Sequence, residues 1–275
     1  MAKTATRQHF IARFYLRNFA EPMFSDNLLV YDVQKRRWEQ RTPNGVGWFP
    51  HLCSMIDMQG NRTDAFDQYL KLNVEDPAAP ALKKLATGGS LDANERSAVA
   101  LFVALTAARS PQLMNTVMTE HLGNLAADDR AELDGLVKLW CGWTGRPYGA
   151  KSHSEFLKPA SFGAIWRWSQ RLQRRLLQWE WHLVHTTRDW PFVTSDRPVF
   201  AQRYRNARLV SFPVSSEVVL ILIAGGQFNE ARDRTRQVCE VNRQSTHGAK
   251  EVVVACRRGF PGDDALMATS APPAG

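Results

Sequence analysis

Apolar positions recur at helical spacing in the middle of the chain, and short apolar runs of strand length lie on both sides of it. Helices are predicted from Thr63, from Pro77 and from Asp92, where Asp92 and Glu95 form a capping-box variant. Pro111 stops the third helix, helix resumes over 112–140, and a long helix follows over about 161–179. Strands are predicted at 28–33, 38–41, 181–187, 192–195, 209–213, 218–224 and 252–256, with a helix at 229–243 before the last.

Strands at both ends of a helical middle predict an α+β fold. We expect a helical middle layer packed against an antiparallel or mixed sheet, built mainly from the C-terminal half plus an N-terminal hairpin. Residues 1–258 are predicted to form one domain, and the tail 259–275, rich in proline and alanine, to be disordered. The longest apolar run, 218–224, is too short to cross a membrane.

The first twenty residues do not resemble a secretory signal, because no apolar core there leads to a small-residue cleavage site. The cysteines are few and far apart and form no CxxC pair, so neither a zinc site nor a disulfide framework is indicated. A reducing cytoplasm is therefore the expected setting. The four cysteines are Cys53, Cys141, Cys239 and Cys256.

Positive charge is concentrated in the second half of the chain. The net charge is +8, and residues 1–137 hold 15 Lys/Arg against 16 Asp/Glu, whereas residues 138–275 hold 20 against 11. Most of the cations in the second half are arginines, which bind phosphate in a bidentate manner. DNA or RNA is therefore an expected partner, with Arg171, Arg174 and Arg175 of the tryptophan-rich helix as contacts. The alternatives are an arginine-rich composition without a partner and a tryptophan stripe that belongs to the core.

The segment 8–20 places two arginines, a histidine and a phenol among apolar residues at the N-terminus. Such a segment is expected to be tied into the core. His9 and Arg13 are four residues apart, which on a helix would put both on one face. The pattern fits an anion-binding or acid/base site, and it also fits an ordinary capped core helix.

The run Gln8-His9-Phe10-Ile11-Ala12-Arg13-Phe14-Tyr15-Leu16-Arg17-Asn18-Phe19-Ala20 resembles the opening of the DUF4238 family, in which many members have proline where this chain has Ala12. Further matches follow in order at 28–32, 74–78, 107–111 and 192–199, the last containing Thr194-Ser195-Asp196-Arg197-Pro198. The resemblance covers roughly 8–257, nearly the whole chain. It implies no settled function, and it strengthens the choice of site residues.

Carboxylates near the predicted element ends are candidates for a site. Asp196 lies where a strand should end, in a pattern that is also an ordinary turn. Asp76 has a structural role as the cap before Pro77, which leaves Glu75 as the better site carboxylate. Asp64 and Asp67 share a helical face, and because Lys71 follows Asp67 by four residues we interpret them as surface residues.

The five candidate residues together suggest phosphodiester chemistry. Two carboxylates, Glu75 and Asp196, could hold Mg²⁺, and the arginines could stabilise charge on a phosphate. Arg109 has an alternative role at the helix C-terminus, with the last carbonyls. We expect the five to converge, with Arg13 within ion-pair reach of Glu75 or Asp196. The set is His9, Arg13, Glu75, Arg109 and Asp196.

The leading hypothesis is a protein that acts on nucleic acid, most concretely a metal-dependent nuclease. No known nuclease signature or Gly-x-x-x-x-Gly-Lys phosphate loop is present. The alternatives are a non-catalytic interaction protein with a buried polar network and a binder of a small phosphorylated ligand. Whether the protein is an enzyme, and how many copies associate, does not follow from the sequence.

Overall fold

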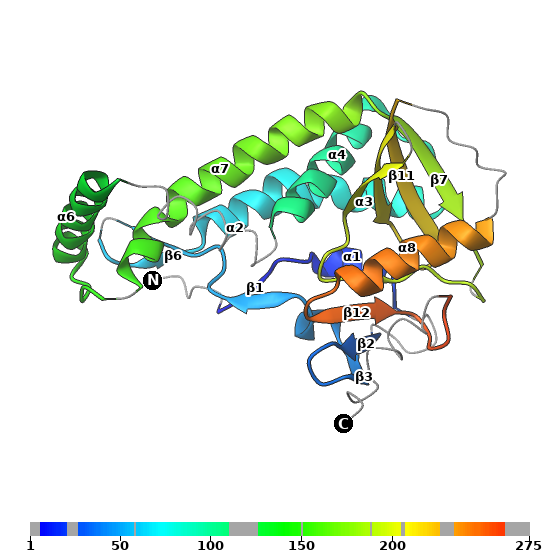
Figure 1. Cartoon of the computed structure of the whole chain (residues 1–275), viewed down its shortest axis with the longest axis horizontal. Helices are drawn as coiled ribbons and strands as arrows, with labels where there is room; N and C mark the ends of the chain where they lie inside the picture. The colour runs from blue at the N-terminus through cyan, green and yellow to red at the C-terminus, as the bar shows by residue number, and fades with distance from the viewer. Residues whose placement is uncertain are drawn as a thin grey trace.

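A layer of helices lies against two antiparallel β-sheets, which confirms the predicted α+β class (Figure 1). The computed structural model describes residues 6–20, 27–57, 59–109, 126–149, 151–187, 189–204, 207–225 and 234–261. The helices are α1 (Arg13–Arg17), α2 (Ala65–Leu70), α3 (Asp76–Ala86), α4 (Ala93–Ala108), α6 (Ala127–Thr144), α7 (Ser152–Leu177) and α8 (Arg234–Gly248).

One sheet has the strand order β7-β11-β10-β9, and all of its pairs are antiparallel. The inner strand β11 is a continuous apolar run because both of its faces are covered. Leu220 and Leu222 join the main core beneath the helical layer, whereas Val219 and Ile221 pack with Val238 of α8. The strands are β7 (Glu180–His185), β9 (Phe200–Tyr204), β10 (Ala207–Pro213) and β11 (Val218–Ala224).

The second sheet has the order β3-β2-β12-β8 and is also antiparallel. The predicted N-terminal hairpin therefore joins C-terminal strands, as expected. The strands of the C-terminal half divide between two sheets rather than forming one, and α8 separates β11 from β12 along the chain. The strands are β2 (Leu28–Asp32), β3 (Arg37–Arg41), β8 (Thr194–Ser195) and β12 (Val252–Ala255), and short pairs join β1 (Arg7–His9) to β4 (Trp48–Pro50) and β5 (Met55–Ile56) to β6 (Arg62–Thr63).

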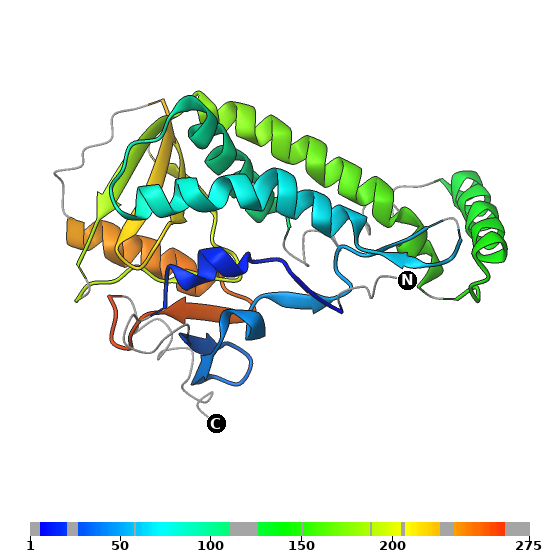
Figure 2. The ribbon, with the colours of Figure 1, turned by 180° about the vertical axis from the view of Figure 1, so that it is seen from behind.

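The longest helix, α7, runs beside α4 along the outer edge of the molecule (Figures 1 and 2). The Gln173 side chain donates hydrogen bonds to the Ser97 carbonyl and hydroxyl at 3.1 and 3.0 Å, which fixes the two helices side by side. Among the residues that the structure describes, no helix combines the length and apolarity needed to span a membrane.

The N-terminal segment lies between the helical layer and the sheets, as Figure 2 shows for α1, and its expected burial is confirmed. Tyr15 is fully buried, and its hydroxyl bonds the Thr194 hydroxyl at 2.7 Å and donates to the Pro213 carbonyl at 2.9 Å. The expectation of one helix carrying His9 and Arg13 is wrong. His9 belongs to β1 and pairs with Trp48, and the helix begins only at Arg13.

Parts of three predicted segments lie outside the described residues. These parts are 112–125 of the helix that was predicted over 112–140, 229–233 of the helix before the last strand, and 262–275 of the tail. Phe260, at the beginning of that tail, is 2% exposed and packs against Trp38. The packed part of the chain therefore extends to at least this residue.

Candidate functional site

A buried guanidinium joins two carboxylates at the C-terminal end of α4. Arg109 is 6% exposed; its Nη1 donates to Glu75 Oε1 at 2.7 Å and its Nη2 to Asp67 Oδ1 at 2.9 Å. Nη2 also lies 3.8 Å from the Cys53 sulfur. Burial opposes the charge on Arg109, but its partners raise the pKa of the guanidinium above its ordinary value. We refer to His9, Cys53, Asp67, Glu75 and Arg109 as the Arg109 cluster.

A π-helical turn over Lys71–Glu75 places both carboxylates on the same side. The backbone N–H of Asp76 donates to the Lys71 carbonyl, five residues earlier, and Pro77 has no N–H with which to continue the α-helical pattern. In a regular α-helix seven residues make about two turns, so the side chains of Asp67 and Glu75, eight residues apart, would point in different directions. The wide turn takes up one extra residue, and Asp67 and Glu75 therefore face Arg109 together.

The interpretation of Asp64 and Asp67 as surface residues is wrong. Lys71 pairs with Asp76 at 2.7 Å rather than with Asp67. Asp64 accepts hydrogen bonds from Gln8 Nε2 and from the Ser54 hydroxyl, each at 2.8 Å. Burial raises the pKa of Asp67, although Arg109 opposes the shift. The sequence spacing gave no signal for this, because the partners of Asp64 and Asp67 come from other segments of the chain.

His9 lies beside this network on β1. Burial first, and then Arg13 and Arg109, lower the pKa of its imidazole, against a hydrogen bond to the Asn44 backbone and the charge of Glu75. Its Nε2 is buried and has no hydrogen-bond partner among the described residues. The surroundings therefore favour the neutral form of the ring, and Nε2 is left without a hydrogen bond to the described protein.

Arg13 takes a different position from the one predicted. Its side chain is exposed, and Nη1 donates to the Asn44 side-chain oxygen at 2.9 Å. Within the described part of the chain it forms no ion pair with Glu75 or Asp196, so the expected ion pair is wrong. Arg109, arriving from α4, is the cation that binds Glu75.

Asp196 belongs to a different hydrogen-bond network from the Arg109 cluster. The residue is 3% exposed, and its Oδ1 accepts the backbone N–H groups of Lys250, Glu251 and Val252 at 2.9, 3.1 and 3.2 Å. These bonds stabilise the turn that enters β12, so its role here is that of a turn residue. Glu75 binds Arg109, whereas Asp196 binds the backbone of residues 250–252. Among the described residues no group of three or more His, Cys, Asp or Glu side chains is arranged to hold a metal ion.

Two further residues near the cluster were missed by the sequence reasoning. Lys158 of α7 donates from Nζ to the His51 carbonyl at 2.8 Å, and burial lowers the pKa of this amine. His51 has a φ of 53°, in the left-handed region that non-glycine residues seldom adopt. The sequence carries no pattern that singles out either residue, because their contact joins positions 107 residues apart.

The predicted nucleic-acid contacts lie on the outward side of α7. Arg171, Arg174 and Arg175 are exposed, together with Arg167, whereas Ile165 and Leu176 are buried on the other side. No ion pair to a described residue involves these four arginines, and residues 156–179 contain no Asp or Glu. The tryptophans of this region are divided: Trp166 and Trp179 pack against the core, and Trp168 is 45% exposed.

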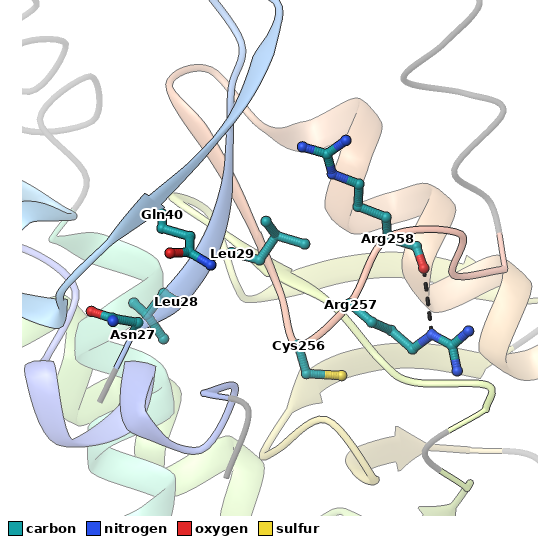
Figure 3. A pocket seen from close by; sticks show the side chains of 7 residues that line it. All are labelled: Asn27, Leu28, Leu29, Gln40, Cys256, Arg257 and Arg258. Carbon is teal, nitrogen blue, oxygen red and sulfur yellow. Dashed lines mark hydrogen bonds between the residues drawn. The ribbon is translucent and has the colours of Figure 1, made fainter. Parts of the chain in front are cut away.

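A separate pocket of about 240 Å³ lies where β2 and β3 meet the end of β12 (Figure 3). Its lining includes Gln40, Cys256 and Arg257, and the Arg257 guanidinium lies 3.4 Å from Asp189. None of the predicted catalytic residues lines this pocket, so it contributes nothing to the Arg109 cluster.

Comparison with known proteins gives one match. The family model described as "Protein of unknown function (DUF4238)" matches residues 7–259. No curated protein and no solved structure matches the chain.

Proposed function

The chain belongs to the DUF4238 family, and within this family of unknown function we propose that it binds nucleic acid through the arginines on the outward side of α7. The observation that carries the proposal is the unbalanced charge of this helix. Four exposed arginines, Arg167, Arg171, Arg174 and Arg175, have no carboxylate partner among the described residues. We call this surface the arginine face.

The spacing of the arginine face suits a phosphate backbone. At a rise of about 1.5 Å per residue, Arg167 and Arg175 lie about 12 Å apart along the helix axis. Phosphates of one strand of B-DNA are about 3.4 Å apart along the duplex axis, so this length corresponds to roughly four phosphates. If each arginine neutralises one phosphate, a plot of the logarithm of the association constant against the logarithm of the salt concentration should have a slope of roughly −3 to −4.

The experiment measures binding of fluorescent DNA and RNA oligonucleotides by anisotropy from 50 to 300 mM salt. We expect Arg171→Glu/Arg174→Glu/Arg175→Glu to lower affinity at least tenfold at low salt and to reduce the slope to about −1 or less in magnitude. The fold should persist because the three side chains are exposed. Thermal melts of both proteins check this.

The matched control reverses three exposed cations elsewhere, as Arg36→Glu/Lys83→Glu/Arg258→Glu. It changes the net charge by the same amount, and we expect it to retain most of the affinity and the slope. Equal losses in the two triple variants would mean that net charge alone attracts the ligand. No binding by the wild-type protein at 50 mM salt, or binding only to phosphatidylserine vesicles, would refute the proposal.

Phosphodiester hydrolysis at the Arg109 cluster is a second candidate, favoured by the unpartnered Nε2 of His9 and by the lowered pKa of its imidazole. Such a ring can act as a general base. A resident Mg²⁺ does not suit the cluster, because Arg109 already binds both nearby carboxylates. Incubation of the same oligonucleotides with Mg²⁺ or EDTA tests cleavage, and His9→Gln should abolish it without changing binding. If the oligonucleotides stay intact in every incubation, the hydrolysis candidate is refuted and nucleic-acid binding alone remains.

The cluster is also separate from the arginine face. Lys158, which contacts His51 near the cluster, precedes Arg171 by thirteen residues of α7, or about 20 Å. The alternative to a catalytic role for the cluster is a structural one, as a buried network between the N-terminal segment and the helical layer. We infer a cytoplasmic setting, which the free, buried thiols of Cys53 and Cys141 support.

A further inference from the structure

An exposed tryptophan lies on the arginine face. Trp168 is 45% exposed, and its ring has no aromatic or cationic partner among the described residues. Arg171 and Arg175 follow it by three and seven residues, so the three side chains leave the same side of α7. Trp166, two residues earlier, instead packs against Tyr69 with ring centroids 5.3 Å apart.

This arrangement indicates which form of nucleic acid the surface suits. A flat indole between guanidinium groups can stack on a base while the arginines bind the flanking phosphates. In a duplex the faces of the bases are covered by their neighbours in the stack, so an indole reaches them only where the strand is unpaired. The helix α7 also lies along the outer edge of the molecule (Figures 1 and 2), and the side chains of the arginine face are exposed to solvent.

We propose that the arginine face binds single-stranded nucleic acid, with Trp168 stacking on an unpaired base. This inference rests on the proposed function and adds the class of ligand. The ligand must offer a base with an uncovered face. It can be DNA or RNA of any sequence, because stacking on an indole is tolerant of sequence. Duplex DNA of the same length is expected to bind through its phosphates alone, and more weakly.

The test compares a 20-nucleotide single strand with the corresponding duplex, for both DNA and RNA, in the anisotropy assay. Trp168→Ala should weaken single-strand binding roughly 5- to 150-fold, the range that alanine substitution of a stacking aromatic gives. It should leave duplex binding and the salt slope nearly unchanged, because the arginines remain. Trp168→Phe, which keeps a smaller aromatic face, should recover part of the loss.

Trp143→Ala is the matched control, since Trp143 is 68% exposed on a different helix, α6. It should bind both ligands like the wild type. Equal affinity of the wild type for strand and duplex, or single-strand binding by Trp168→Ala at the wild-type level, would overturn the stacking proposal while leaving phosphate binding intact. Failure of the underlying function looks different, because the wild type would then bind neither ligand at low salt.

Discussion

Replacement of Arg109 by methionine should destabilise the protein strongly. The substitution keeps an aliphatic side chain of similar length but removes two charge-assisted hydrogen bonds, at 2.7 Å to Glu75 and 2.9 Å to Asp67. Such bonds contribute about 1.5–3 kcal/mol each. Breaking a buried ion pair by removing one partner costs about 3–5 kcal/mol, in agreement with that sum. Two partly buried carboxylates would be left facing each other.

The loss should depend on pH. Burial already raises the pKa of Asp67 in the folded protein. A carboxyl group with a raised folded-state pKa favours folding at low pH, and that contribution is lost as the pH rises through the folded-state value. Removing Arg109 takes away the charge that opposes this shift. The free energy of unfolding that Arg109→Met loses relative to the wild type should therefore be larger at pH 7.5 than at pH 5.

The assay is urea denaturation at both pH values together with thermal melts. A loss of 3–5 kcal/mol corresponds to a drop in melting temperature of about 6–20 °C for a protein of this size. Arg13→Met is the matched control, because Arg13 is exposed and makes one hydrogen bond to Asn44, so its loss should stay below about 1 kcal/mol. A free energy of unfolding of Arg109→Met within about 1 kcal/mol of the wild-type value at pH 7.5 would refute the reasoning.

Two further predictions concern Asp196 and His9, which the sequence suggested as site residues. Asp196→Asn keeps an acceptor oxygen but loses the charge that three backbone N–H groups face, so it should cost about 1–3 kcal/mol in thermal melts without affecting nucleic-acid binding. An unchanged melting temperature would contradict the turn-stabilising role. The lowered pKa of His9 means that the unfolded chain takes up a proton near pH 6.5 before the folded protein does, so stability should fall below that pH. His9→Gln should reduce this fall in urea denaturation between pH 7.5 and 5.5, and an identical pH dependence would count against it.

Local patterns along the chain were enough to predict the fold class and most of the element positions. The capping box at Asp92 and Glu95 is present, since Asp92 accepts the Glu95 N–H and Glu95 accepts the Asp92 N–H. The N-terminal burial followed from the number of aromatic and branched residues in a short segment. The grouping of Arg171, Arg174 and Arg175 on one side of a helix was likewise predictable, because side chains spaced three and four residues apart share a side. Only the tertiary structure decided that this side is exposed.

The content of the candidate site was decided by contacts between distant segments. Arg109 meets Glu75 and Asp67 across 34 and 42 residues, and the π-helical turn that aligns these carboxylates breaks the 3.6-residue period used to interpret the sequence. Asp196 has a strand-end pattern that fits a site or a turn equally, and its partners at 250–252 come from β12 and the turn before it. A carboxylate's role depends on which donors surround it once the chain has folded, and local sequence does not specify those donors.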